Sequence, residues 1–120
     1  MSHQFDPSSE RFLVVESRPD GRRTVVSVSG EIDLATVDRV ERVAADALAS
    51  AESVALDLRE VTFIDSTGLR LLLELDDLAM AGGRALTLLP GATVTRLLEL
   101  TGLDRRFQRA AAPAASTERA

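Results

Sequence analysis

The chain of 120 residues contains no cysteine and a single histidine, His3, close to the N-terminus. Without cysteine there is no disulfide framework, no thiolate nucleophile and no cysteine metal site. One terminal histidine makes a histidine-based triad or metal site equally unexpected. No apolar run approaches the roughly 20 residues that span a bilayer, and the first residues lack the pattern of a secretory signal. We therefore expect a cytoplasmic protein that does not insert into a membrane and carries neither metal nor cofactor.

Lysine is also absent, so every basic residue is an arginine, and the formal net charge is −5. The charge is unevenly placed, because residues 31–77 hold 12 acidic residues against four arginines. Such an acidic middle would repel the phosphates of a nucleic acid, which we exclude as a partner. It suits a basic protein partner, although a solvated surface explains the same charge about as well.

The pattern of apolar residues predicts elements in the order β-β-α-β-α-β-α. Residues 12–17 and 24–29 should form an antiparallel hairpin around a turn at 18–21. Two β-α-β units with parallel strands should follow, so we predict a single α/β domain with a mixed sheet and helices packed on it. The predicted strands are 54–58 and 85–89, joined through a loop at 59–64 and a helix ending near residue 81. A short helix over 94–100 precedes Leu103 and Phe107, which can fold back onto the core.

The predicted domain covers residues 11–108. Residues 1–10 are polar and contain Pro7, which favours a flexible N-terminal tail. Residues 109–120 are rich in alanine, with Pro113, and favour a disordered tail. Asp33 is a plausible N-cap for the first helix.

The run Asp65-Ser66-Thr67-Gly68 opens the second predicted helix, where backbone N–H groups lack intrahelical partners. Ser66 can cap this helix, or it can accept a phosphate that the helix N-terminus tolerates. Ser66 and Arg70 share an outward stripe of the helix, which makes the hydroxyl reachable, and Gly68 would leave room for another backbone. On these four residues alone, a simple cap is the more common role.

Three segments together carry a family resemblance. The sequence resembles the STAS domain in Gly30-Glu31-Ile32-Asp33, in Asp57-Leu58 with Val61-Thr62-Phe63-Ile64-Asp65-Ser66-Thr67-Gly68-Leu69, and in Arg96-Leu97-Leu98-Glu99-Leu100-Thr101-Gly102-Leu103. The resemblance covers residues 12–107 and is strongest to bacterial anti-sigma-factor antagonists. One departure is that these antagonists commonly end in a further amphipathic helix after the position of Phe107, where this chain is rich in alanine and proline.

The resemblance implies a partner-switching regulator that is not an enzyme. The unphosphorylated antagonist would bind an anti-sigma factor, which then releases its sigma factor. That anti-sigma factor is also a serine kinase that uses ATP, and it would phosphorylate Ser66. A serine phosphatase would restore the antagonist. By the same resemblance, Asp33 lies near the phosphosite and Asp65 flanks it. Thr67 is a less favoured acceptor, and Thr67, Gly68 and Arg70 complete the predicted partner-binding set.

Two other readings stay open. The domain could be a STAS accessory subunit of a membrane transport system for lipids or anions, in which Ser66 need not be modified. Alternatively, Asp33, Asp57 and Asp65 could hold Mg²⁺ in a small phosphoryl-transfer enzyme. The absence of lysine, of a usable histidine and of a phosphate-cradling glycine loop argues against that enzyme. A simpler interpretation is that Asp57 forms a hydrogen bond with the backbone of residues 59–61.

Overall fold

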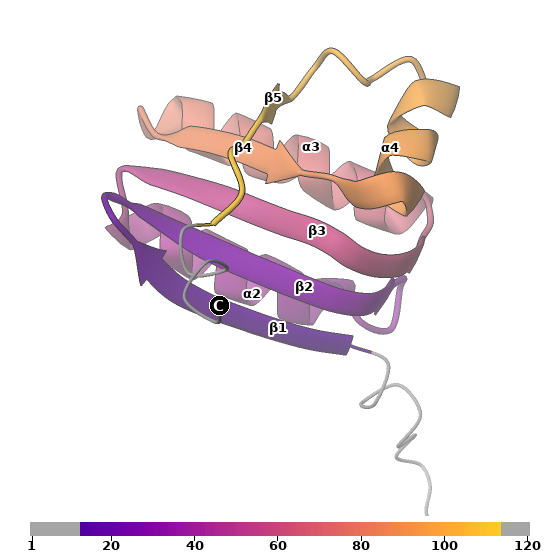
Figure 1. Ribbon diagram of the computed structural model, residues 1–120, viewed down its shortest axis with the longest axis horizontal. Coiled ribbons are helices and arrows are strands. Elements are labelled where there is room, and N and C mark those ends of the chain that lie inside the picture. The colour runs from indigo at the N-terminus through magenta and orange to yellow at the C-terminus, as the bar shows by residue number, and fades with distance from the viewer. Residues whose placement is uncertain (1–12, 114–120) are drawn as a thin grey trace, which may run out of the picture.

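Five strands form one sheet in the order β1-β2-β3-β4-β5, with helices packed beside it (Figure 1). This computed structural model describes residues 13–113, so the predicted tail at residues 1–10 lies outside the described part. The elements in chain order are β1 Leu13–Asp20, β2 Arg23–Ile32, α2 Val37–Ser50, β3 Ser53–Ile64, α3 Ser66–Ala81, β4 Ala85–Leu89, α4 Gly91–Leu100 and β5 Gln108–Arg109.

The sheet is mixed, as predicted. Strands β1 and β2 form an antiparallel hairpin, whereas β2, β3, β4 and β5 run parallel to one another. Parallel neighbours need a crossover, and α2 and α3 provide the first two by crossing the same face of the sheet (Figure 1). The α/β fold class is therefore confirmed.

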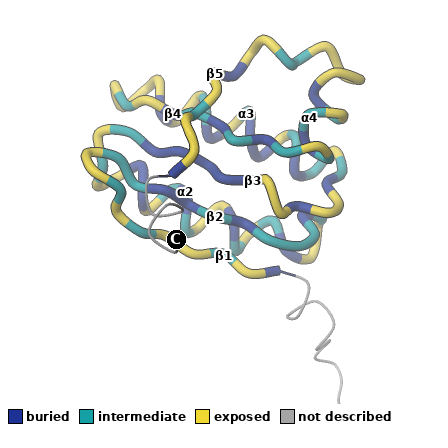
Figure 2. Tube along the Cα trace, viewed as in Figure 1, coloured by how far each residue is buried: buried dark blue, intermediate teal, exposed yellow. Residues whose placement is uncertain are grey.

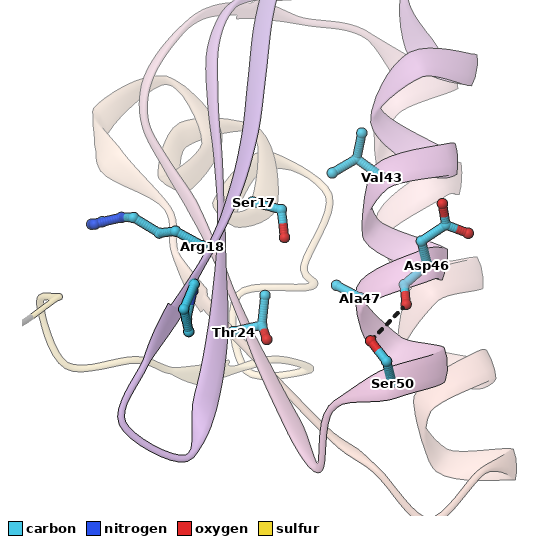
Figure 3. A pocket seen from close by; sticks show the side chains of 8 residues that line it. Ser17, Arg18, Thr24, Val43, Asp46, Ala47 and Ser50 are labelled. Atoms are coloured by element: carbon cyan, nitrogen blue, oxygen red, sulfur yellow. Dashed lines mark hydrogen bonds between the residues drawn. The ribbon is translucent and has the colours of Figure 1, made fainter.

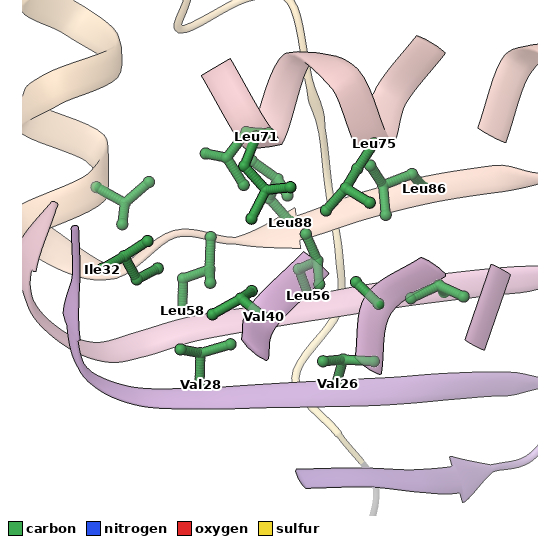
Figure 4. Close-up of a cluster of buried hydrophobic side chains, with 14 of the residues drawn as sticks. Val26, Val28, Ile32, Val40, Leu56, Leu58, Leu71, Leu75, Leu86 and Leu88 are labelled. Carbon is green, nitrogen blue, oxygen red and sulfur yellow. The ribbon is translucent and has the colours of Figure 1, made fainter. Parts of the chain in front are cut away.

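The hydrophobic core lies between this face of the sheet and the two helices (Figure 4). Every second residue of a strand points to one face, and those that point toward the helices are aliphatic. The main contributors are Val26, Val28, Leu56, Leu58, Leu86 and Leu88 from the strands and Val40, Leu71 and Leu75 from the helices. Figure 2 shows burial concentrated along β3, whose residues 54–58 are all buried, as expected for a strand covered on both faces.

The hairpin turn is tighter than predicted. We expected residues 18–21 to form the turn, but β1 continues to Asp20, which pairs with Arg23. The turn is therefore Gly21 and Arg22, and Gly21 has a φ of 67°, which favours glycine. Pro19 is tolerated inside β1 because an edge strand has one side without ladder hydrogen bonds.

The predicted loop at 59–64 is wrong, because β3 runs without a break to Ile64. Its register against β2 shifts twice, between Ser27 and Ser29 and again between Gly30 and Glu31. Each shift places one extra residue on β3, as in a β-bulge. These bulges interrupt the alternation of apolar and polar residues, which is why the sequence pattern predicted a loop.

The C-terminal segment also differs from prediction. Residues 109–113 were expected to be disordered, but Gln108 and Arg109 form β5, and the Ala110 N–H donates to the Leu88 carbonyl at 2.8 Å. The chain then crosses the face of the sheet opposite α2 and α3 (Figure 1). The side chain of Arg23 donates to the carbonyl of Ala111 at 3.0 Å. Residues 114–120 lie outside the described part.

The fold-back predicted just before β5 is confirmed. The Phe107 side chain is 6% exposed and belongs to the core, and Leu103 packs against the same cluster. These contacts hold the chain after α4 against the sheet.

Candidate functional site

The candidate site lies where β2 and β3 end side by side. Ile32 and Ile64, the last residues of these parallel strands, are register partners. The Asp65 N–H donates to the Ile32 carbonyl at 3.4 Å, so the chain after β3 stays tied to the end of β2. Asp33 and Asp65 follow these two isoleucines directly. The structure thus brings together two of the predicted site residues at the carboxyl edge of the sheet.

Ser66 is the first residue of α3, and it is exposed. The N-cap of α3 is Asp65 and not Ser66, so the predicted capping role of Ser66 is wrong. The Asp65 carboxylate accepts hydrogen bonds from the N–H groups of Thr67 at 2.9 Å and Gly68 at 3.3 Å. The Ser66 hydroxyl makes no hydrogen bond to any other residue of the described range 13–113. It is therefore available to an external group.

Gly68 does not belong to the surface of the site. It is buried, and a Cβ at this position would lie 2.6 Å from Ile64 Cγ1 and 3.0 Å from Ile32 Cγ2. The missing side chain lets α3 pack tightly on the ends of β2 and β3, and the space that we predicted for another backbone is filled by the side chains of Ile32 and Ile64. Of the remaining predicted residues, Thr67 is half-buried, and Arg70 is exposed one turn further along α3.

Asp33 does not cap α2 as predicted. The N-cap is Thr36, whose side chain makes no capping bond to the helix. Asp33 instead closes a turn before the helix, because its carboxylate accepts from the Ala35 N–H at 3.0 Å and its carbonyl accepts from the Val37 N–H at 2.9 Å. The Asp33 side chain remains partly exposed.

Sequence reasoning missed three residues around the site. Thr36 is 3% exposed, and its hydroxyl bonds the turn that contains Asp33. Its position directly before the first periodic apolar residue, Val37, is the signal that could have identified it as the N-cap. Leu34 and Phe63 are 79% and 46% exposed. The sequence does not show that these two side chains are exposed, because an apolar residue in such a pattern is expected to be buried.

Asp57 lies on the opposite face of the sheet from α2 and α3 and pairs with Arg59. Its carboxylate accepts from Arg59 Nη2 at 2.8 Å, from Arg59 Nε at 2.9 Å and from the Arg59 N–H at 3.2 Å. Burial alone would raise the pKa of Asp57. The hydrogen bonds from Arg59 and the charges of Arg59 and Arg18 outweigh burial and hold this pKa below its ordinary value. The expected bond from Asp57 to the backbone of residue 59 is present.

Asp57 does not join Asp33 and Asp65. It lies seven residues before the end of β3, roughly 20 Å along an extended strand. Within residues 13–113, no group of three or more acidic or histidine side chains is arranged to hold a metal ion. The magnesium hypothesis therefore finds no support in the geometry.

A separate cleft of about 330 Å³ lies between the β1–β2 hairpin and the C-terminal end of α2 (Figure 3). The hydroxyl groups of Ser17, Thr24 and Ser50 line it. It contains none of the predicted site residues, because Asp33 and Ser66 lie near the other end of α2. None of the described helices is long and apolar enough to cross a membrane.

Comparison with solved structures first defines the class of fold. An anti-sigma factor antagonist from Mycobacterium paratuberculosis has a TM-score of 0.71 and 28% sequence identity, covering 89% of this chain and 92% of that one. The anti-sigma factor antagonist SpoIIAA in its unphosphorylated form has a TM-score of 0.68 and 20% identity, covering 88% of this chain and 95% of that one. A putative antagonist from Thermotoga maritima has a TM-score of 0.68 and 22% identity, covering 88% and 92%. The last two likenesses show the fold alone.

The family follows from the sequence itself. The STAS domain model matches residues 13–119, which is most of the chain. The protein therefore belongs to the STAS domain family, as the motifs around Asp33 and Ser66 indicated. A search of curated protein sequences gave no significant match.

Proposed function

We propose that this protein is an anti-sigma-factor antagonist that is switched by phosphorylation of Ser66. The proposal depends on one observation. Ser66 is exposed at the N-terminus of α3, and its hydroxyl makes no hydrogen bond to another described residue. A kinase can reach such a hydroxyl without unfolding the domain. The likeness to the antagonist from Mycobacterium paratuberculosis supports the same regulatory role.

The charges around Ser66 suit an electrostatic switch. A phosphoserine adds −1.5 to −2 charges at neutral pH. At a helix N-terminus an added phosphate usually takes up free N–H groups, but here the Thr67 and Gly68 N–H groups already donate to Asp65. The new charge would thus stand beside one carboxylate, Asp65, with a second, Asp33, at the same edge of the sheet. A partner that docks here would meet a dense negative cluster.

Such a cluster can reject a partner without any change of fold. Inverting a complex from 99% bound to 1% bound takes about 5.5 kcal/mol of differential affinity. A charge left unpaired in an interface costs several kcal/mol, which is of this size. Arg70, at i+4 from Ser66 on the same side of α3, can lie beside the phosphate or contact the partner.

The proposed partner is an anti-sigma factor that is itself a serine kinase using ATP. The unphosphorylated protein would bind it and so release a sigma factor. Phosphorylation of Ser66 would end the complex, and a serine phosphatase would restore the starting state. The protein itself would act by binding and not by catalysis. The excess of acidic residues in the middle of the chain favours a basic contact surface on this partner.

Incubation with the anti-sigma kinases of the same organism and ATP, followed by peptide mass spectrometry, tests the proposal. We expect one added phosphate, on Ser66. Ser66→Ala should bind the kinase and stay unmodified, whereas Ser66→Asp should bind at least 10-fold more weakly. Ser50→Ala and Ser50→Asp are matched controls, because Ser50 is an exposed helical serine at the far end of α2. Thr67→Val should leave the phosphate in place.

Two results would contradict the proposal. Ser66→Asp that binds as tightly as the wild type would exclude the charge mechanism. Recovery of transport-system subunits in a pull-down, in place of a kinase, would favour the role of an accessory subunit in membrane transport.

A further inference from the structure

Leu34 is an apolar side chain that the fold holds out into solvent. It is 79% exposed, more than any other large apolar residue among those described. It lies directly after Asp33, at the edge of the sheet where Asp33 and Asp65 meet. An exposed leucine in a flexible loop would need no explanation, because single exposed apolar residues are common. The local hydrogen bonds show that this loop is not loose.

The turn that carries Leu34 is fastened by the buried hydroxyl of Thr36. Thr36 Oγ1 donates to the Glu31 carbonyl at 2.7 Å and accepts from the Asp33 N–H at 3.0 Å. Both ends of the segment Glu31–Asp33 are thereby held to one atom. The Ala35 N–H donates to the Asp33 carboxylate, which closes the turn on the other side of Leu34.

We propose that Leu34 is a contact residue for the protein that binds at Ser66. Thr36 is the positioning residue that holds Leu34 in its exposed position. The inference rests on the proposed function and extends it to the chemistry of the partner. Holding Leu34 in one place reduces the conformational entropy that binding must remove. The partner would offer an apolar pocket for Leu34, bordered by arginine or lysine side chains that face Asp33 and Asp65. Phe63, 46% exposed near the end of β3, adds a second apolar contact.

The contact role is tested by affinity for the kinase that modifies Ser66. Leu34→Ala should weaken binding by about 10- to 100-fold, the range expected when a leucine no longer enters a pocket. Its thermal unfolding should match the wild type, because the side chain is exposed. Met80→Ala is the matched control, since Met80 is 69% exposed at the opposite end of α3. Leu34→Ala that binds like the wild type would overturn the proposal.

The positioning role has a readout that needs no partner. In Thr36→Val the residue keeps its shape and loses its hydroxyl, so amide exchange at residues 33–35 should rise at least 10-fold. Thr36→Ser retains the hydroxyl and should restore slow exchange. Binding should weaken in Thr36→Val and recover in Thr36→Ser, at a temperature where both are folded. Unchanged exchange in Thr36→Val, or faster exchange with unchanged binding, would overturn the positioning role.

The two proposals fail in different ways. If the wild type binds no kinase, the proposed function falls, and the contact role of Leu34 falls with it. The amide exchange of Thr36→Val still decides whether this hydroxyl fixes the turn. If the kinase binds and Ser66→Asp releases it, but Leu34→Ala has no effect, only the contact role is wrong.

Discussion

Gly68 offers a direct test of how α3 is seated, and we expect Gly68→Ala to destabilise the protein. The added Cβ would lie 2.6 Å from Ile64 Cγ1 and 3.0 Å from both Ile64 Cδ1 and Ile32 Cγ2. Carbon atoms at optimal packing are about 3.5–4.0 Å apart. Ile64 is β-branched and stiff at its first side-chain torsion, so its Cγ1 cannot simply rotate away. The helix must therefore shift outward or the isoleucines must leave their preferred rotamers.

Two opposing terms set the size of the effect. Overpacking a filled core costs about 1–3 kcal/mol. Replacing glycine by alanine in a helix returns up to about 1 kcal/mol of helix propensity. We therefore expect a net loss of about 1 kcal/mol, which corresponds to a fall in Tm of about 4 °C for a domain of this size. Urea unfolding followed by circular dichroism measures the first quantity, and a thermal scan measures the second.

Gly82→Ala, at the other end of the same helix, is the control. A Cβ at residue 82 would have no neighbour closer than 3.6 Å, and the φ of −93° suits any residue. That variant should be as stable as the wild type, or up to about 1 kcal/mol more stable. If Gly68→Ala were likewise as stable as the wild type, the tight packing of α3 on β2 and β3 would not constrain this position, and the reasoning would be refuted.

Three further changes have defined outcomes. Asp65→Ala removes the N-cap of α3 and should cost about 1 kcal/mol in urea unfolding, with Asp65→Asn recovering most of it. Asp57→Asn should lower stability at pH 7, and its deficit should shrink below about pH 4, because a carboxylate with a depressed pKa contributes stability that protonation removes; an unchanged deficit at pH 3 would contradict the ionic role of Arg59. Arg23→Met removes the bond to the Ala111 carbonyl and should speed amide exchange in residues 108–112 without changing exchange in α3.

Much of the fold follows from patterns that depend on burial. The hairpin, the parallel β-α-β units and the fold-back of Phe107 are predictable because each apolar run must be buried, and the pattern of the chain leaves one plausible packing for each. The meeting of Asp33 and Asp65 is predictable in outline, since parallel strands deliver their carboxyl ends to one edge. The short strand β5 was missed because its pairing with β4 is made by backbone groups, and no side-chain pattern records it.

The details of the site were harder to predict from the sequence, because several side chains can form the same hydrogen bond and only one of them does. Asp65 and Ser66 can both cap a helix, and only the backbone at residue 65, with φ −112° and ψ −168°, makes the aspartate the cap. Gly68 was expected to leave room for another backbone, whereas the structure requires a glycine there because the Ile64 side chain lies so close. Thr36 bonds a carbonyl and an N–H that are up to five residues away, a relation that periodicity does not reveal.

The two bulges of β3 have a consequence for how the chain tolerates changes in length. Between Asp57 and Phe63, β3 uses six steps where its partner β2 uses four. The β3 residues that face the helices therefore change from a spacing of two, as for Leu56 and Leu58, to intervals of three, at Leu58, Val61 and Ile64. Deleting one residue at either bulge would return β3 to the two-residue spacing of β2 and leave the faces of the residues after it, including Ile64, unchanged. A one-residue deletion in the regular part of β3, at residues 54–57, would instead exchange the inward and outward faces, so the two bulges are the places where this strand should tolerate a change of length.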